Sequence, residues 1–279
     1  MKIAVCGLGR MGTAFAEVLA ADGHELTGWN RTARQIPGVR PTGTPAQAAA
    51  EADAVVVMVF DGPAAEAVLL GPDGVTTGAR RGTLVVNTTT LSPDESRRLA
   101  GAVIAEGLRY VEAPVIGSVP AVRARALTTL VGGTPEAARA AEPVLRSWSQ
   151  AGAVRHVGPV GAATGLKLVA NLGLGLALAA LHEVVGLGAG FGLAREEVLD
   201  VVQGGVFGRL VEGKRARLSQ DSYGEADFTL DGMVKDMTLA TSATDARLPV
   251  AEAAARLIER VARRDGGLDV AVMGASHTV

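Results

Sequence analysis

A run of glycines directly after a short apolar segment is the first feature of this sequence that could do chemistry. Lys2 to Cys6 has the pattern of a strand, and the residues Gly7-Leu8-Gly9-Arg10-Met11-Gly12 follow at once, before an Ala/Leu-rich helical pattern begins at Thr13. In that order, G-x-G-x-x-G is typical of a dinucleotide-binding turn. The first glycine allows the turn, the second lets a pyrophosphate approach, and the third lets helix and strand pack closely. We therefore expect this loop and the helix N-terminus to bind the cofactor's phosphates.

The end of the second expected strand indicates which dinucleotide binds. That strand, Glu25–Trp29, is followed by Asn30-Arg31-Thr32. A site for NAD(H) usually has an acidic residue near this point for the ribose 2′-hydroxyl, whereas an arginine accommodates a 2′-phosphate. Because Asn30, Arg31 and Thr32 bring a cation and no carboxylate, we predict that the cofactor is NADP(H).

Lysine is rare in this chain, and one lysine has a context that suits catalysis. The lysines are Lys2, Lys167, Lys214 and Lys235, and the other basic residues among the 27 are arginines. An amine can release a proton where a guanidinium cannot, and apolar surroundings lower its pKa. Lys167 lies near the start of a long apolar segment, with Asn171 four residues on and on the same helical face. We predict that Lys167 is a general acid/base for a carbonyl and that Asn171 holds its amine or a substrate hydroxyl. The alternative is a lysine whose amine only reaches solvent.

The elements that must position these residues alternate along the first half of the chain. Helical patterns separate the expected strands, and Ser92-Pro93-Asp94-Glu95 is typical of a helix start. The expected strands are Lys2–Cys6, Glu25–Trp29, Ala54–Phe60, Thr83–Asn87, Arg109–Ala113, Leu127–Val131 and Arg155–Val157. This alternation predicts an α/β, Rossmann-type, doubly wound and mostly parallel sheet.

Strand patterns stop near Gly161, and helical patterns continue from there to the end. We predict a nucleotide-binding domain over residues 1–160 and an all-α domain over residues 161–279, whose long first helix begins at about Ala162.

Composition argues against several classes of protein. The formal net charge is −2 without a basic cluster, so nucleic acid is not an expected partner. The histidines have no metal-ligand spacing, so no metal is expected. Leu166 to Leu193 is long and apolar, but charged residues and glycines interrupt it, so we predict a buried helix and no membrane span. No signal peptide precedes the first strand, and Cys6 is the one cysteine, so we expect a cytoplasmic protein.

These segments together resemble the β-hydroxyacid dehydrogenase family, which includes 3-hydroxyisobutyrate dehydrogenases and glyoxylate/succinic semialdehyde reductases. The resemblance covers nearly the whole chain, and Asn30-Arg31-Thr32 is similar to the form in NADP-dependent members. The matching segments are Gly7–Gly12, Thr89–Pro93, Glu112–Ser118, Gly161–Asn171 and Phe228–Ala240. The resemblance implies that Lys167 is the catalytic lysine and Asn171 its amide partner.

The resemblance also implies roles for residues that the patterns alone do not identify. Thr90 would contact the cofactor near its nicotinamide, and Lys235 would approach the cofactor, unless Lys235-Asp236 is an ordinary surface charge pair. Ile116, Gly117 and Ser118 would bind substrate, because Glu112 to Ser118 stands where the family has Asp-Ala-Pro-Val-Ser-Gly-Gly.

This segment departs from the family pattern. Ile116 replaces the serine and should weaken the grip on a substrate carboxylate. Ser118 or Arg125 could compensate for that loss, or Arg125 could be a solvated residue at a strand edge.

The function that the resemblance implies is hydride transfer between NADP(H) and a small carbonyl or hydroxyacid of the semialdehyde type. A homodimer packed through the helical domain is also implied. One alternative is an NADPH-dependent imine reductase, because the loop with Ile116-Gly117 resembles the corresponding loop of those enzymes. Imine reductases usually lack lysine at the position of Lys167, however. Another is a cofactor-binding dimer with little catalysis, a scaffold or sensor, which the retained Lys167 and Asn171 oppose.

Overall fold

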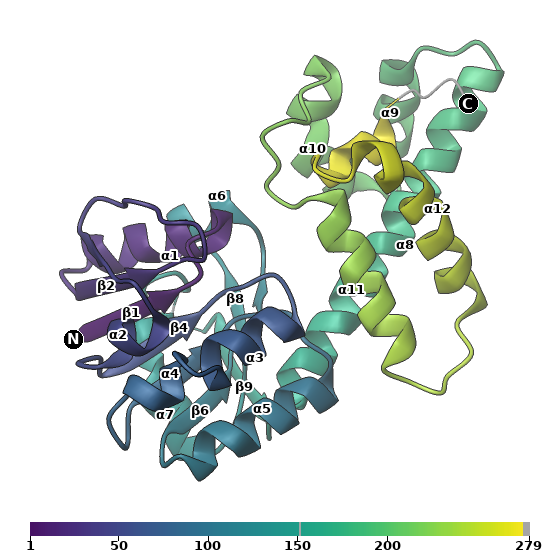
Figure 1. Cartoon of the computed structure of the whole chain (residues 1–279). Coiled ribbons are helices and arrows are strands. Elements are labelled where there is room, and N and C mark those ends of the chain that lie inside the picture. The colour runs from purple at the N-terminus through teal and green to yellow at the C-terminus, as the bar shows by residue number, and fades with distance from the viewer. Residues whose placement is uncertain (151, 276–279) are drawn as a thin grey trace. The chain divides into compact units, whose positions relative to one another are not determined.

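The computed structural model describes residues 1–150 and 152–275, and it divides into two compact units, Met1–Lys167 and Leu168–Val279 (Figure 1). Residues 276–279, the end of the predicted helical domain, lie outside the described residues. The roles predicted for the two domains stay predictions. These roles are cofactor binding for residues 1–160, and substrate binding and dimerisation for residues 161–279.

Among the described residues, a nine-stranded sheet forms the centre of the first unit. Its order is β3-β2-β1-β4-β5-β6-β8-β7, with β9 paired to β8. The strands are β1 (Lys2–Cys6), β2 (Glu25–Trp29), β3 (Val39–Pro41), β4 (Ala54–Val57), β5 (Leu84–Asn87), β6 (Arg109–Glu112), β7 (Val115–Ile116), β8 (Thr128–Gly132) and β9 (Val154–Gly158). Pairing is parallel from β3 to β6, whereas β8 is antiparallel to β6 and β7. The predicted Rossmann-type, mostly parallel sheet is confirmed.

Alternation along each strand gives the sheet two apolar faces, and helices cover both (Figure 1). In β1, Ile3 and Val5 belong to one core cluster, and Ala4 and Cys6 to the other. The first face packs against α1 (Arg10–Ala21), α6 (Val119–Arg123) and α7 (Pro135–Leu145), and the second against α2 (Pro45–Ala49), α3 (Gly62–Leu70), α4 (Val75–Gly78) and α5 (Pro93–Ala105). Burial raises the pKa of the Cys6 thiol to about 12, so the thiol stays protonated. Cys6 therefore serves as a packing residue of the core.

The predicted elements differ from the observed ones mainly at their ends. α5 begins as predicted, because Ser92 and Glu95 form a reciprocal capping box around Pro93. β4 ends at Val57 and not at Phe60, and β8 begins one residue later than predicted. We did not predict β3, β7, α4 or α6, because these elements are too short to show a period of their own.

The second unit is helical, as predicted. Its elements are the continuation of α8 (Ala162–Gly190), then α9 (Arg195–Gln203), α10 (Gly208–Gln220), α11 (Leu230–Ser242), α12 (Pro249–Asp265) and the 3-10 helix η1 (Val270–Gly274). Leu, Val, Ile and Met side chains from these helices form one core. A Cβ on Gly175 would overlap the sulfur of Met237, so this glycine lets α11 pack closely on α8.

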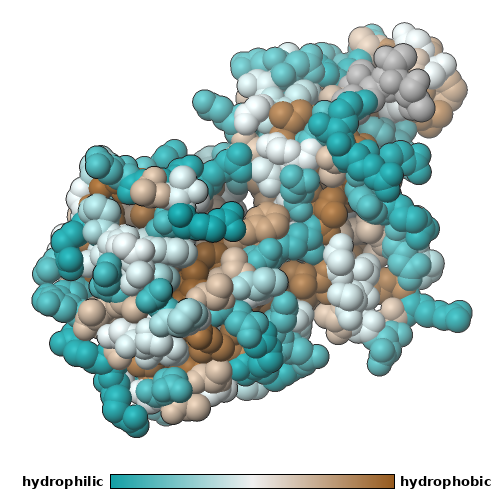
Figure 2. Space-filling view, viewed as in Figure 1, coloured by the Kyte–Doolittle hydropathy of each residue, from teal (hydrophilic) through white to brown (hydrophobic). Residues whose placement is uncertain are grey.

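Helix α8 is less covered than the sequence predicts. It is long and apolar enough to cross a membrane by length and composition, and 39% of its most apolar window is buried within the chain. Leu166, Val169 and Leu187 are exposed. On the face shown in Figure 2, apolar side chains emerge in small groups among hydrophilic ones. Exposed apolar residues along one helix are typical of a surface that binds another protein or a membrane.

Candidate functional site

The glycine loop after β1 has the shape that a dinucleotide requires. Gly7 has φ +100°, and a Cβ there would overlap the carbonyl oxygen of Met58. A Cβ on Gly12 would overlap the carbonyl oxygen of Gly7, whereas nothing lies within 4 Å of a Cβ on Gly9. α1 begins at Arg10 without a side-chain cap or an acidic residue in its first turn. The open space at Gly9 and the uncapped helix N-terminus fit a pyrophosphate.

Asn30 ties the end of β2 to this loop. Its Oδ1 accepts the N–H of Leu8 at 2.9 Å, and its Nδ2 donates to the carbonyl oxygen of Thr32 at 2.8 Å. The amide therefore orders the loop, a role that the sequence did not indicate. Arg31 is exposed and forms no hydrogen bond or ion pair with any residue in the described ranges. An unpaired guanidinium next to Asn30 is available for a phosphate.

The other cofactor-side residues share one edge of the sheet. The glycine loop follows β1, Asn30 follows β2, and Thr88 to Thr90 follow β5, so all lie at the carboxyl ends of parallel strands. The strand order reverses between β1 and β4, which is where ligands bind in open α/β sheets. Thr88 donates to the carbonyl oxygen of Val57 and is buried, as is Thr89, whereas Thr90 is half-buried. Of these three threonines, Thr90 is the one that reaches the surface.

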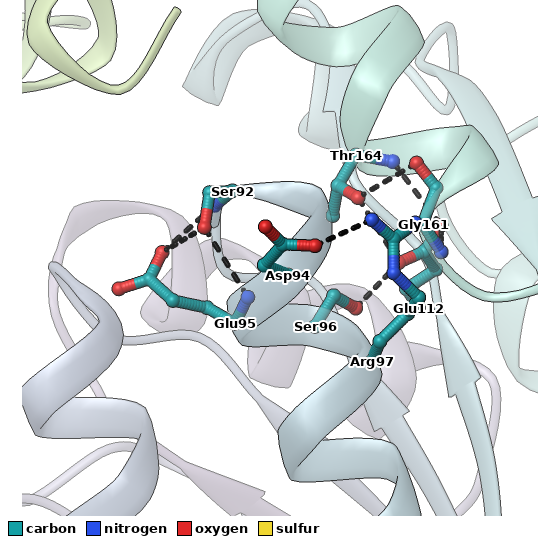
Figure 3. Close-up of polar contacts among 8 residues, drawn as sticks. All are labelled: Ser92, Asp94, Glu95, Ser96, Arg97, Glu112, Gly161 and Thr164. Atoms are coloured by element: carbon teal, nitrogen blue, oxygen red, sulfur yellow. Dashed lines mark hydrogen bonds and ion pairs between the residues drawn. The ribbon is translucent and has the colours of Figure 1, made fainter. Parts of the chain in front are cut away.

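The carboxylate of Glu112, at the end of β6, is 1% exposed and holds the start of α8 (Figure 3). Oε1 accepts the backbone N–H groups of Gly161, Ala163 and Thr164 at 2.9, 2.8 and 3.2 Å. Oε2 accepts the hydroxyls of Ser96 at 2.5 Å and Thr164 at 3.1 Å. A carboxylate is thus placed at the positive end of α8, where it is most favourable.

This cap lies one helical turn before Lys167, which is half-buried. Sequence reasoning treated Glu112 only as the first residue of a motif and missed its contacts. An acidic residue directly after Tyr110 and Val111 at the end of a strand was the available indication, because a buried carboxylate must be matched by donors.

In the second unit, Asn171 has a partner that the sequence did not indicate. Its Nδ2 donates to Oδ2 of the buried Asp236 at 2.5 Å, and Oδ1 of Asp236 accepts from Nζ of Lys235 at 2.6 Å. The amide nitrogen of Asn171 therefore already has an acceptor in Asp236. Since Asp236 is buried, its contact with Lys235 is not an ordinary surface pair. Oδ1 of Asn171 forms no hydrogen bond within the described part of the chain, which leaves an acceptor for a ligand.

In the segment expected to bind substrate, few polar side chains form hydrogen bonds with the described residues. Ile116 is half-buried, Gly117 has φ +128°, and the Ser118 hydroxyl forms no hydrogen bond with the residues that the structure describes. Arg125 has φ +54° and grips Asp22 with two hydrogen bonds of 2.9 and 2.6 Å, which lower the pKa of that carboxyl. The guanidinium of Arg125 is thus engaged by Asp22, while its side chain is still 40% exposed.

Two cavities lie away from these residues. One of about 710 Å³ is lined by Arg195, Asp221 and Tyr223, among others, and another of about 490 Å³ opens at Lys2 and Asp53. Neither contains a residue of the predicted site. Over residues 1–150 and 152–275, no group of three or more His, Cys, Asp or Glu side chains could hold a metal ion.

Comparison with known proteins identifies the fold and its chemistry at the level of a family. Residues 2–158 match the NAD binding domain of 6-phosphogluconate dehydrogenase, and residues 161–274 match the NAD-binding family of NADP-dependent 3-hydroxyisobutyrate dehydrogenase. The chain belongs to the family of NAD(P)-dependent hydroxyacid dehydrogenases. As a member of this family it is an NAD(P)-binding oxidoreductase.

Individual relatives extend over almost the whole chain. The uncharacterized oxidoreductase YfjR of Bacillus subtilis is 32% identical over 284 residues, 98% of each chain. The 2-(hydroxymethyl)glutarate dehydrogenase of Eubacterium barkeri is 30% identical over 250 residues, 87% of this chain and 82% of that one. The structure of Mycobacterium tuberculosis 3-hydroxyisobutyrate dehydrogenase with L-serine is 27% identical, with a TM-score of 0.83 over 98% of this chain and 97% of that one.

Proposed function

We propose that this member of the family is an NADP(H)-dependent oxidoreductase that interconverts a small aldehyde or ketone of the semialdehyde type and the corresponding hydroxyacid. This proposal depends mainly on the residues that follow β2. Arg31 is exposed and unpaired within the described ranges, and Asn30 stands where NAD sites usually have a carboxylate. The match of residues 161–274 to an NADP-dependent dehydrogenase family supports the same cofactor.

Each residue of the proposed site has its own role in the reaction. A bound nicotinamide supplies or accepts the hydride. Lys167 donates a proton to the carbonyl oxygen during reduction and takes it from the hydroxyl during oxidation. Oδ1 of Asn171 accepts a hydrogen bond from the substrate or from the amine. Thr90 and Lys235 contact the cofactor, and Ile116 to Ser118 line the substrate site. We further propose that the enzyme is a cytoplasmic homodimer.

The choice of cofactor is tested by fluorescence titration with NADPH and NADH. We expect NADPH to bind at least about tenfold more tightly, because a guanidinium at the 2′-phosphate adds a charge-assisted hydrogen bond. Arg31→Ala should remove most of that preference by weakening NADPH alone. The control Arg139→Ala removes an exposed arginine of α7 that is paired with Glu136, and it should change neither affinity. Equal affinity of the unaltered protein for both dinucleotides would refute the proposed cofactor.

The substrate is tested by following NADPH oxidation with glyoxylate, succinic semialdehyde, other small aldehydes and cyclic imines. We expect turnover with an aldehyde. Ile116 favours one rival, an imine reductase, since it places an apolar side chain where the family has a serine hydroxyl. Turnover confined to the cyclic imines would replace the proposed reaction with that rival. NADPH binding without turnover of any compound would favour a cofactor-binding scaffold or sensor.

A further inference from the structure

The contacts of Glu112 continue into the sheet as a chain of buried polar groups. Ser96, which donates to Oε2 of Glu112, also lies next to the hydroxyl of Tyr110. That hydroxyl accepts from Nδ2 of Asn87 at 3.0 Å, and Oδ1 of Asn87 accepts the backbone N–H of Thr89 at 3.1 Å. All five residues are at most 2% exposed. A network of buried polar groups, shielded from water, therefore extends from the loop after β5 to the carboxylate that caps α8.

The donors in this network can all point toward the carboxylate. The amide of Asn87 donates to the Tyr110 hydroxyl, and Ser96 donates to Glu112. The backbone N–H groups at the start of α8 and the Thr164 hydroxyl donate to the same carboxylate from the other side. Hydrogen bonds aligned in this way polarise one another, and a low dielectric strengthens them. Burial also raises the pKa of Tyr110 to about 12, so its hydroxyl keeps its proton at neutral pH.

Both ends of the network are next to residues of the proposed site. Thr89 precedes Thr90, and Thr164 lies one helical turn before Lys167. A buried carboxylate is a costly way to stabilise a fold, since apolar residues of similar volume are often as stable or more so. A carboxylate with matched donors does fix geometry more tightly than apolar packing, which explains its use at this point.

We propose that Glu112 is a positioning residue for Lys167, and that the Asn87–Tyr110–Ser96 chain holds the first turn of α8 in register with the loop of residues 88–90. The catalytic part of this inference rests on the proposed function. Glu112→Gln tests it directly, because the amide carries no charge at the N-terminus of α8 and its NH2 end would require the Ser96 and Thr164 hydroxyls, which donate to Oε2, to accept instead. Tyr110→Phe tests it more mildly, because it removes one hydroxyl from the middle of the chain and keeps the ring.

The first measurement is hydrogen–deuterium exchange of the peptide that covers residues 161–167, which does not depend on activity. We expect exchange to be at least about tenfold faster in Glu112→Gln, and faster by a smaller factor in Tyr110→Phe, because the cap is lost or loosened. The matched control is Thr129→Val, which removes a buried hydroxyl bonded to Ser149 at 2.8 Å and to Trp148 at 3.1 Å. Thr129→Val should leave this peptide at its original rate. Unchanged exchange in both Glu112→Gln and Tyr110→Phe would overturn the inference.

The second measurement is turnover of the best aldehyde in the panel, together with NADPH affinity. We expect Glu112→Gln to lower kcat at least about tenfold while NADPH affinity changes less than about threefold. Glu112→Asp, which keeps the charge, should retain more activity than Glu112→Gln, and Thr129→Val should retain all of it. Faster exchange with unchanged kcat would overturn the positioning role. If Lys167→Ala proved fully active, the proposed function would fail, but the exchange experiment would still decide whether Glu112 holds α8.

Discussion

At the scale of single residues, the chain keeps one amine near the start of α8 although nearly all its other cations are guanidinium groups. We expect Lys167→Ala to lower kcat by about two orders of magnitude or more, the usual scale for losing a general acid, with NADPH affinity little changed. Steady-state kinetics with the best aldehyde of the panel measure this. Lys2→Ala is the control, since Lys2 is exposed and pairs with Glu51. Undiminished turnover would remove Lys167 from the reaction.

Ile116 is a second residue with a measurable consequence. An isoleucine cannot hydrogen-bond a substrate carboxylate, so activity should depend less on that carboxylate than is usual in the family. We expect Ile116→Ser to raise the ratio of kcat/KM for succinic semialdehyde over that for butyraldehyde by about tenfold, the scale of one polar contact to a charged group. Ile116→Val keeps the apolar surface and should leave the ratio unchanged. A strong preference for the carboxylated aldehyde before any substitution would contradict this interpretation.

At the scale of elements, Asp269 joins α10 to the start of η1 in the second unit. It is fully buried, with Oδ1 accepting Nζ of Lys214 at 2.8 Å and the N–H of Ala271 at 2.9 Å, and Oδ2 accepting the N–H of Asp227 at 2.9 Å. Burial alone would raise the pKa of this carboxyl, but Lys214 and the N–H groups lower it overall. The charged form of Asp269 therefore stabilises the fold.

We expect Asp269→Asn to lower the free energy of unfolding by about 3 kcal/mol at pH 7, because it leaves a half-buried ammonium without its partner. A group with a lowered pKa contributes stability above its unfolded pKa of about 3.9 and loses it as the pH falls through the folded value. The difference between Asp269→Asn and the unaltered protein should thus shrink below about pH 4. Urea unfolding at pH 7 and pH 3 measures it, and an equal difference at both values would contradict the assignment.

The elements also show how far the sequence could predict this molecule. Local patterns predicted β1, β2, the capped start of α5 and the start of α8, since each depends on neighbours within a few residues. The antiparallel direction of β8 has no local pattern, because it depends on which strand lies beside it. The partners of Glu112 and Asn171 were missed for a similar reason, as they lie 16 to 65 positions away along the chain.

At the scale of the whole molecule, exposed apolar side chains toward the end of α8 support the proposed homodimer. Leu187 is 59% exposed and Phe191 is 72% exposed. We expect light scattering to give about twice the chain mass of 28.4 kDa, and Leu187→Glu with Phe191→Glu to give a monomer, because burying two carboxylates is unfavourable. Ile104→Glu, at an exposed site on α5, is the control. A monomer before any substitution would refute the dimer.

The scarcity of lysine has a practical consequence for attaching the protein to a surface. Lys2 is exposed at the amino end of β1, whereas Lys167, Lys214 and Lys235 are half-buried. Amine-directed coupling at moderate pH should therefore proceed through Lys2 and the adjoining N-terminal amine. Since the glycine loop follows the opposite end of the same strand, a chain immobilised on a sensor chip or bead would present that loop to the solution, and dinucleotide binding should survive the coupling.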